Sequence, residues 1–500
     1  MEQLLHGFSI ALVPTNLFYC FIGVLIGTLI GVLPGIGPAG AMSLLLPLTF
    51  KTSAVEAMIM LAGLYYGAMY GGSTTSILVN IPGEAASVVT CIDGHQMALK
   101  GRAGPALGIA AFGSFIAGCA SVVGLMLLAP TLASWALRIG PPEFFGILCM
   151  GLTLVIYLTS GSMIRALMMA CFGLMLGCVG QDPETGVLRF VFGNLNLHNG
   201  IDMVPLAMGL FGISEVFLNI EKSLVERITL EGKIKNLLPN VQDWKDSYKS
   251  IARGSVLGFL LGIIPGGGAV VSSFASYAVE KKLSKHPEQF GRGAIEGVAG
   301  PEAANNAATG GAFIPLFTLG IPSNVIMALL LGALVIHGVT PGPMMITKHP
   351  DVFWSIVASM YVGNGLLLLL NLPLIGIWVK VLKVPYRVLF PLILLFCLIG
   401  AYSVNNNRFD IGIMLAFGVL GYLMRKFSFD GAALILAFVL GPLFENSLRQ
   451  SLLLSDGSFA IFFTRPIAGA AMVGTFLLLV SCIVPFIRSK REKIIEKEPT

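Results

Sequence analysis

The chain has 500 residues, of which 55% are hydrophobic and only 11% are charged. Soluble proteins carry roughly 25% charged residues, so this composition excludes an ordinary soluble protein. The net charge of +5 reflects the distribution of basic residues among loops, and it does not indicate nucleic-acid binding.

Apolar runs of membrane-spanning length follow one another along the whole chain, for example at 8–33, 54–79, 104–136, 353–382 and 467–487. About 20 apolar residues in a helix cross the hydrocarbon core of a bilayer. We therefore predict an all-α polytopic membrane protein with roughly 11–13 transmembrane helices plus broken or re-entrant segments. A β-barrel would have short alternating segments instead.

Lys and Arg predict the orientation, because they accumulate in cytoplasmic loops. Residues 1–50 contain none, whereas 221–250 contain six and 488–500 contain five. We therefore expect a first membrane repeat at 1–220, a cytoplasmic polar linker at 221–250, a second membrane repeat at 251–487 and a basic cytoplasmic tail at 488–500. The N-terminus would then be periplasmic and the C-terminus cytoplasmic.

The first apolar run ends in "GVLPGIGPAG" (31–40), where Pro and Gly break the helix. A similar stretch opens the second half: "GVLIGTLIGVLPGIG" (23–37) and "GSVLGFLLGIIPGGG" (254–268) share seven of fifteen residues. Glycine at every fourth position lines one helix face and permits close helix packing. A pair of unrelated glycine-rich membrane helices is the alternative interpretation.

A weaker similarity relates "YGGSTTSILVNIPGEA" (70–85) to "GGAFIPLFTLGIPSNV" (310–325), in the same order after the first pair. When the Ile-Pro pairs are aligned, the Gly pairs are one residue out of step. Because the two glycine-rich helices start from opposite sides in the predicted orientation, we expect two inverted-topology repeats, a common plan of secondary transporters.

Breaks are therefore expected at 34–38, 80–84, 265–268 and 320–324. Non-helical backbone at membrane depth is tolerated only where protein or a water-filled cavity covers it, and broken helix ends offer N–H groups to anions and C=O groups to cations. Polar residues flank the breaks, notably in "GGSTTSILVN" (71–80) and "GPEAANNAATGG" (300–311). Hydroxyls bonded within their own helix, and a surface loop at 300–311, are the alternatives.

These observations predict a binding site near the membrane midplane. We expect the substrate to contact Gly35, Gly37, Ser73, Thr74, Thr75, Asn80, Gly83, Gly266, Gly267, Asn305, Asn306, Thr309, Ser323 and Asn324. A Na⁺ site near the same segments is possible, without assigned ligands. Nearby ionisable residues are functional candidates, and for two of them, Glu84 and Glu302, a helix cap in a loop is the alternative.

Several long motifs resemble the large membrane subunit of bacterial tripartite tricarboxylate transporters: "GVLPGIGPAG", "YYGAMYGGSTTSILVNIPGEAASVVTCIDGHQMALKGRAGPALG", "GIIPGGGAVVSSFASYAVEKKLSK" and "GAIEGVAGPEAANNAATGGAFIPLFTLGIPSN". Relatives often have GIPGS where this chain has "GIPSN" (320–324). The resemblance implies a multi-pass protein of the bacterial inner membrane that imports citrate-like di- or tricarboxylates.

The resemblance also implies partners: a small membrane subunit and a periplasmic solute-binding protein. It implies no cofactor, and an ion gradient, with Na⁺ as the expected coupling ion, in place of ATP. No HExxH motif or suitable Asp pair supports an intramembrane enzyme, and no GxxxxGK[ST] motif supports a P-loop ATPase. A passive anion channel is poorly separated from a transporter by sequence.

Overall fold

The computed structural model describes residues 2–33, 37–158, 162–182, 184–221, 237–382 and 386–481, with backbone alone for 386–389. The first half contains the helices α1 Glu2–Ala11, α2 Pro14–Val32, α3 Gly37–Leu45, η1 Leu46–Lys51, α4 Ala54–Val79, η2 Ala85–Ser87, α5 Val88–Met97, η3 Ala98–Arg102, α6 Ala103–Ala136, α7 Pro141–Leu158, α8 Met163–Gly177, η4 Leu195–Leu197, α9 Met203–Ala207, η5 Met208–Ile213 and α10 Ser214–Glu221. A small hairpin of β1 (Gly180–Gln181) and β2 (Leu188–Arg189) precedes η4.

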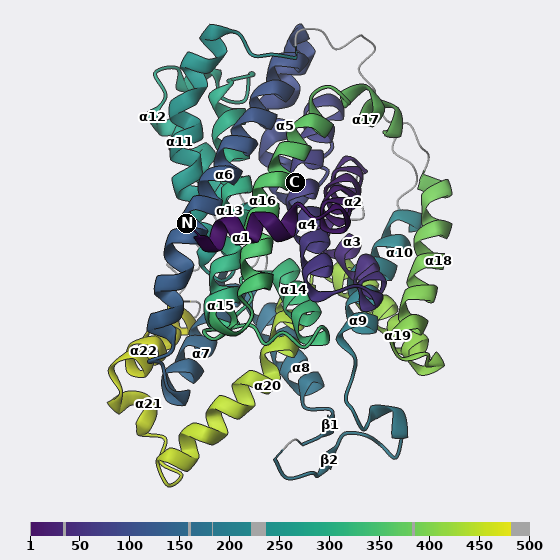
Figure 1. The fold of residues 1–500 in the computed structure, drawn as a ribbon, viewed down its shortest axis with the longest axis vertical. Helices are drawn as coiled ribbons and strands as arrows, with labels where there is room; N and C mark the ends of the chain where they lie inside the picture. Colours follow the sequence, from purple (N-terminus) through teal and green to yellow (C-terminus); the bar gives the residue numbers. More distant parts are fainter. Residues whose placement is uncertain are drawn as a thin grey trace.

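The second half contains α11 Val241–Ile263, α12 Gly268–Leu283, η6 Pro287–Gln289, α13 Glu296–Leu319, α14 Val325–Ile336, α15 Met345–Lys348, α16 Pro350–Asn371, α17 Ile375–Val381, α18 Tyr386–Asn405, α19 Arg408–Lys426, α20 Gly431–Leu454, α21 Ile461–Thr464 and α22 Pro466–Ser481. Helices dominate (Figure 1), which confirms the predicted all-α class. The expected linker at 221–250 overlaps α11, while 222–236 and the tail at 488–500 lie outside the described residues.

Six helical segments of the described chain are long and apolar enough to cross a membrane: Pro14–Val32, Ala85–Ala136, Pro141–Leu158, Met203–Glu221, Pro350–Asn371 and Gly431–Leu454. Shorter apolar helices accompany them, such as Val325–Ile336. A helix of 12 residues is only about 18 Å long. Further crossings would therefore be built from shorter or less apolar helices, as the expected broken segments imply.

Close backbone packing explains the glycine at every fourth residue of α2. A Cβ added at Gly23, Gly27 or Gly31 would lie within 2.5 Å of a backbone carbonyl oxygen of α4. The glycines therefore let α2 and α4 touch through their backbones, in parallel orientation. At the end of α2, Leu33 turns into extended backbone, and α3 starts at Gly37.

The second half repeats this arrangement in α11 and α13. A Cβ at Gly254, Gly258 or Gly262 would lie within 2.3 Å of the carbonyl oxygen of Gly300, Ala304 or Ala308. Ile264 is extended like Leu33, and α12 starts after the break. The predicted similarity of the two glycine-rich helices therefore corresponds to one packing arrangement that occurs twice.

In each half, the long helix that follows the glycine-rich pair packs against the glycine-rich pair of the other half. In the first half, α6 packs against α11 and α13, whereas in the second half α16 packs against α2 and α4. Likewise α3 contacts α14, and α12 contacts η2 and α5. The polar segments of both halves therefore meet inside one body instead of lying in two separate bundles.

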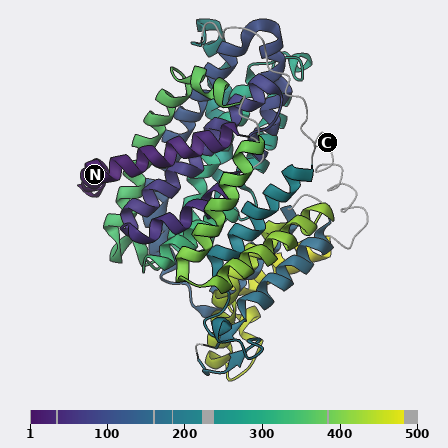
Figure 2. The same ribbon diagram turned by 90° about the vertical axis from the view of Figure 1, so that its right-hand side faces the viewer.

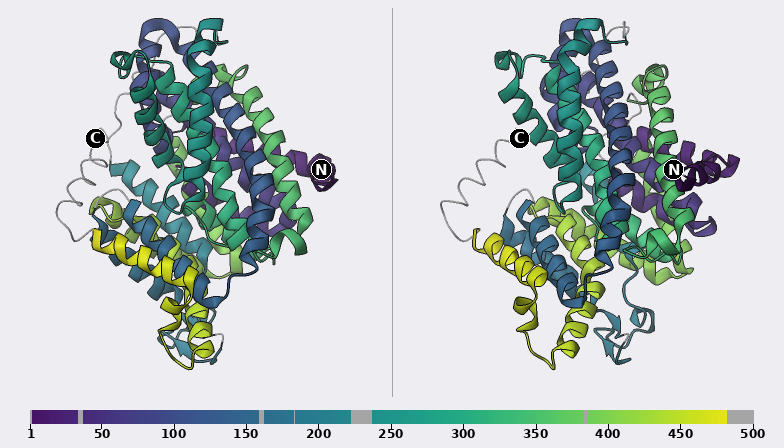
Figure 3. Two further views of the ribbon diagram at one scale, coloured as in Figure 1. Left: turned by 90° about the vertical axis from the view of Figure 1, so that its left-hand side faces the viewer. Right: turned by 60° about the vertical axis from the view of Figure 1, so that its left-hand side comes forward.

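A second group of helices flanks this body. In it α8 packs against α20, α10 against α19, and α7 against α20 and α22. Figure 2 shows its blue and yellow-green helices on the side opposite the N-terminus, and both views of Figure 3 show the yellow α22 beside α7. The β1–β2 hairpin projects from the lower end of the molecule in Figure 1.

Candidate functional site

The polar stretch near the end of α4 is buried, and it consists of Ser73, Thr74, Thr75 and Ser76. Ser73 Oγ donates a hydrogen bond to Glu302 Oε2 at 2.6 Å. Thr75 Oγ1 donates to the carbonyl oxygen of Val32 at 2.8 Å, next to the break that follows α2. The predicted cluster therefore divides: one hydroxyl faces the second half, and another secures the end of α2.

Glu302 joins three helices. It lies inside α13 with no exposed surface, and its carboxylate accepts hydrogen bonds from Ser73 of α4 and Thr90 of α5. The alternatives of a loop cap for Glu302 and of a surface loop at 300–311 are wrong, because α13 is continuous through this segment. Its small residues leave room for the backbone of α11.

Glu84 occupies the break after α4. Asn80 ends that helix in the left-handed conformation, and Glu84 then caps η2 by accepting the Ala86 N–H at 2.6 Å. Its Oε1 accepts a hydrogen bond from Asn305 Nδ2 of α13 at 3.4 Å. Glu84 is thus both a cap, as one alternative held, and a buried carboxylate in contact with the second half.

The break after α13 has the same construction. Gly320 ends α13 in the left-handed conformation, and Asn324 caps α14 by accepting the Met327 N–H at 3.0 Å. Asn324 Nδ2 donates to the hydroxyl of Tyr65 of α4 at 3.2 Å. At both breaks, a side chain already satisfies part of the helix N-terminus that the sequence predicted to be free.

One offset of 240 residues relates these contacts. It places Asn80 on Gly320, Glu84 on Asn324 and Tyr65 on Asn305. The contact from Tyr65 to Asn324 therefore becomes the contact from Asn305 to Glu84 when the halves are exchanged. From Tyr65 to Ser73 the residue numbers of α4 rise, while those of their partners fall from Asn324, just after α13, to Glu302 inside α13, so the two helices are antiparallel.

The same offset places Gly71 on Gly311, and each faces the glycine-rich helix of its own half. A Cβ at Gly71 would lie 2.3 Å from Thr28 O, and one at Gly311 would lie 2.4 Å from Phe259 O. The glycine that makes the close contact is therefore at the same position in both halves, and the one-residue discrepancy concerns only its neighbour, which is Gly72 in the first half and Gly310 in the second.

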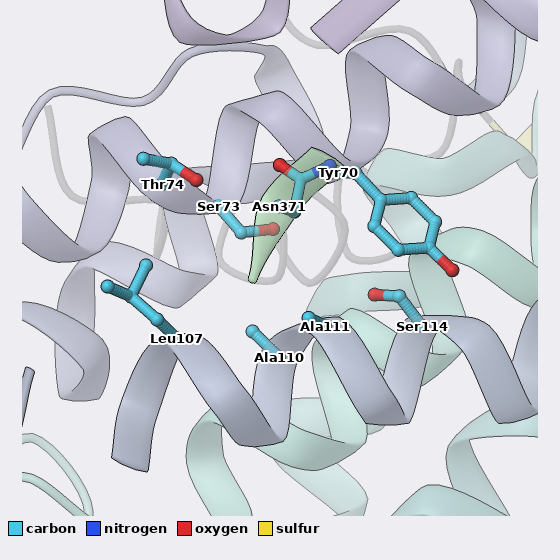
Figure 4. Close-up of a pocket in the computed structure, with 8 residues that line it drawn as sticks. All are labelled: Tyr70, Ser73, Thr74, Leu107, Ala110, Ala111, Ser114 and Asn371. Carbon is cyan, nitrogen blue, oxygen red and sulfur yellow. The ribbon is translucent and has the colours of Figure 1, made fainter. Parts of the chain in front are cut away.

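A small pocket lies between α4, α6 and the end of α16 (Figure 4). It is lined by Tyr70, Ser73, Thr74, Leu107, Ala110, Ala111, Ser114 and Asn371. Its space is close to that of one water molecule. A carboxylate the size of citrate can enter only if the lining helices move apart.

Two further predicted residues lie beside this pocket. Asn306 Nδ2 donates to Ser114 Oγ at 2.7 Å, and Thr309 Oγ1 donates to the Asn306 carbonyl oxygen at 2.6 Å. The Oδ1 atoms of both Asn305 and Asn306 are buried without a hydrogen-bond partner among the described residues. Unpaired buried oxygens are costly, and they mark places where a ligand or water is expected.

The remaining predicted residues lie at the breaks. The Gly266 N–H donates to the carbonyl oxygen of Ser323 at 2.9 Å, which joins the two breaks of the second half. Gly83 lies so close to Gly31 that a Cβ would be 1.9 Å from its carbonyl oxygen. Asn80 is exposed, Gly37 and Gly267 flank helix starts, and Gly35 lies outside the described residues.

Several polar residues of this region lie outside the predicted set: Tyr65, Tyr70, Thr90, Ser114, Asn364 and Asn371. Tyr70 donates to Asn364 Oδ1 at 3.1 Å, and Asn371 lines the pocket. Asn364 and Asn371 had a readable signal, because they are amides inside the apolar run 353–382. The two tyrosines had none, since a buried tyrosine on an apolar helix is ordinary core.

Residues 17–436 match the family described as tripartite tricarboxylate transporter TctA. The chain belongs to this family. An "Uncharacterized 52.8 kDa protein in TAR-I ttuC' 3'region" of Agrobacterium vitis is 51% identical over 498 residues, which cover 100% of this chain and 99% of that protein. No solved structure matches the chain.

A second protein of Agrobacterium vitis, "Uncharacterized protein in TAR-II ttuC' 3'region", is 53% identical over 241 residues, or 48% of this chain and 100% of that protein. The family match confirms the predicted resemblance, and it makes the chain a membrane subunit of a tripartite tricarboxylate transport system. Both relatives are described as uncharacterized, so they identify no substrate.

Proposed function

We propose that this TctA-family chain is the large subunit of a secondary transporter that imports citrate-like di- or tricarboxylates through the bacterial inner membrane. An ion gradient, with Na⁺ as the coupling ion, would drive import without a cofactor or enzymatic step. A periplasmic solute-binding protein would deliver the carboxylate, and a small membrane subunit would complete the complex. The N-terminus would be periplasmic and the C-terminus cytoplasmic.

The observation that carries this proposal is the reciprocal contact between the two halves. Glu84 meets Asn305, and Tyr65 meets Asn324, at the breaks of antiparallel helices. Inverted repeats with broken helices that meet near the midplane are the usual plan of secondary transporters. The substrate would bind beside the break at 80–84, next to Ser73 and Asn305, whereas the breaks at 265–268 and 320–324 lie about 22 Å along α13 from Asn305.

Alternating access follows from the same arrangement. The pocket beside Ser73 has the space of about one water molecule, so in this form it is too small for a tricarboxylate. Movement of one body of helices against the other would open the site to one side at a time. The exchanged helices α6 and α16 would carry this movement, since each packs against the glycine-rich pair of the opposite half.

Uptake of radiolabelled citrate into proteoliposomes tests the proposal. The vesicles hold this chain with its small subunit, and the binding protein is added outside, with an inward Na⁺ gradient or with equal Na⁺ on both sides. We expect accumulation above equilibrium only with the gradient and the binding protein. Equilibration without accumulation would identify a passive channel. Failure with citrate and with other di- and tricarboxylates under Na⁺ and proton gradients would refute transport.

A further inference from the structure

The pocket beside Ser73 is rich in oxygen atoms whose lone pairs are free. Ser73 Oγ uses its hydrogen toward Glu302, and Tyr70 uses its hydroxyl hydrogen toward Asn364. Asn371 is 4% exposed, and its Oδ1 has no hydrogen-bond partner among the described residues, whereas its Nδ2 donates to Leu367 O at 3.0 Å. Three lining groups therefore offer acceptors, with their polar hydrogens already engaged.

The opposite wall of the pocket is apolar. Figure 4 shows Ser73, Thr74 and Asn371 gathered at one side, across from Ala110 and Ala111 of α6. The polar ligands thus come from α4 and from the end of α16, which belong to different halves of the chain. A bound species would be surrounded by oxygen on one side and closed off by methyl groups on the other.

A buried carboxyl group, that of Glu302, lies behind the polar side of the pocket and is bonded to Ser73. Glu302 is completely buried, and its described contacts are the hydroxyls of Ser73 and Thr90. The ion pairs of the described residues include neither Glu302 nor Glu84. A buried carboxylate needs a cation or a proton, because an uncompensated charge is strongly disfavoured in a protein interior.

Size and charge select the kind of cation. The space of about one water molecule excludes a hydrated ion or an organic cation. Carboxylate, hydroxyl and amide oxygens suit hard cations. Mg²⁺ usually keeps several waters, and Ca²⁺ takes six to eight oxygen ligands, which exceeds what one water-sized space beside a single carboxylate offers.

We propose that this pocket binds one dehydrated Na⁺ ion, held by oxygens of Ser73 and Asn371 and balanced by the charge of Glu302. The site rests on the proposed transport function, to which it adds the residues that bind the coupling ion. Because Asn371 ends α16 and Ser73 lies on α4, occupancy would draw the two halves together. Na⁺ binding would thereby stabilise the closed arrangement.

Thermal unfolding of the purified full-length chain in nanodiscs tests the site without transport. NaCl is titrated at constant ionic strength against choline chloride, and KCl is tested in parallel. A ligand that binds only the folded state stabilises it by RT ln(1 + [L]/Kd), so the melting temperature rises with ligand concentration. We expect a rise that begins near the Kd for Na⁺ and continues logarithmically above it, and that K⁺ does not reproduce.

Variants then locate the site. Glu302→Gln keeps the shape of the side chain and removes the charge, and Asn371→Leu removes the unpartnered oxygen. Each should weaken the apparent Na⁺ affinity at least about tenfold, which corresponds to about 1.4 kcal/mol. Glu280→Gln is the matched control, because Glu280 is also buried but is paired with Arg253, and its Na⁺ response should equal that of the natural chain.

The outcomes are distinct. An unchanged melting temperature in Na⁺, or a Na⁺ response retained in both site variants, would overturn the proposal. So would stabilisation by falling pH without any Na⁺ effect, because the carboxylate would then hold a proton. If Glu302→Gln does not fold, Ser73→Ala and Asn371→Leu decide. Na⁺ binding in a chain that transports no carboxylate would refute only the transport function, whereas transport without Na⁺ binding would refute only this site.

Discussion

The break that follows α4 and the break that follows α13 have the same backbone conformation and different chemistry. In the first half the capping residue is Glu84, which meets Asn305, whereas in the second half it is Asn324, which meets Tyr65. Both halves end a long helix in the left-handed conformation and start the next one with a side-chain cap. The difference is that the Glu84–Asn305 contact contains a carboxylate, whereas the Asn324–Tyr65 contact is neutral.

The same asymmetry holds deeper in the helices. Glu302 of α13 corresponds to Ala62 of α4 under the 240-residue offset, and both are fully buried. The glycine contacts are therefore repeated in both halves, whereas the carboxyl groups are not: Glu84 corresponds to Asn324, and Glu302 corresponds to Ala62. Symmetry serves the scaffold, where both copies must pack alike, and asymmetry serves binding, where one ion or substrate needs one set of ligands.

The largest expected effect comes from the glycine contacts that the halves share. Gly27→Val and Gly258→Val place a side chain against backbone atoms of α4 and α13, respectively. Each should destabilise the chain by about 3 kcal/mol, at the upper end of the usual cost of overpacking. Melting temperature and gel-filtration profile measure the effect. Gly365→Val, where a Cβ meets nothing within 4 Å, is the control. If only one of the two glycine variants lost stability, the two halves would not depend on the same kind of contact.

A second substitution removes the carboxylate from the Glu84–Asn305 contact, so that both contacts between the halves are neutral. Glu84→Asn keeps a capping side chain and removes the carboxylate that Asn305 contacts. Since hydrogen bonds to charged groups contribute about 1.5–3 kcal/mol, uptake of citrate in proteoliposomes should fall at least about tenfold while the chain remains folded. Asn324→Ala, which removes no charge, should reduce uptake less. Equal losses in both variants would contradict a special role for the charge.

A substitution at the neutral Asn324–Tyr65 contact should have a smaller effect on stability. Asn324→Ala removes the cap of α14 and the contact with Tyr65, and loss of a cap costs about 1 kcal/mol. The melting temperature should therefore fall by a few degrees. Asn324→Asp keeps the capping oxygen and should retain most of the stability. If Asn324→Ala lowered the melting temperature as much as Gly258→Val, the Asn324–Tyr65 contact would be as important for packing of the halves as the glycine contact.

The smallest effect concerns a difference outside the apolar helices. The first half carries the β1–β2 hairpin between α8 and α9, where the Arg449 guanidinium holds the pKa of Asp182 well below its usual range. A lowered carboxyl pKa stabilises the folded state above the ordinary pKa of about 4 and loses this effect as pH falls further.

Amide exchange of residues 178–202, corrected for the intrinsic rate at each pH, measures this contribution. Protection should be constant from pH 7 to pH 5 and decline below about pH 4. Asp182→Asn should remove most of the pH dependence. A loss of protection that occurs between pH 7 and pH 5 would show that other groups hold the hairpin.

Particular elements separate what could be predicted from what could not. The breaks at 80–84 and 320–324 were readable from Ile-Pro with Gly or Asn before them, since these residues stop helices through their own backbone preferences. The α2 and α11 similarity was readable because glycine periodicity is local. By contrast, 300–311 could be interpreted as a loop, and only the packing against α11 and α6 shows why a helix of such small, polar residues is stable.

The candidate site divides in the same way. Ser73, Asn305 and Asn306 were found from their types and positions, whereas their partners Glu302, Glu84 and Ser114 depend on which helices become neighbours. Thr75 was assigned to the substrate, yet its hydroxyl bonds to the end of α2. Asn371 contributes to the pocket only because α16 packs against the first half.

The sequence by itself determined the membrane class, the family, the two related halves and the positions of the breaks, because composition, glycine spacing and helix-breaking residues act through nearby chain. The exchange of α6 and α16, the antiparallel contact of α4 with α13 and the pairing of Ser73 with Glu302 were decided only by the tertiary structure. Residues 229 positions apart meet through the register of packed helices, and that register depends on the fit of all their side chains together.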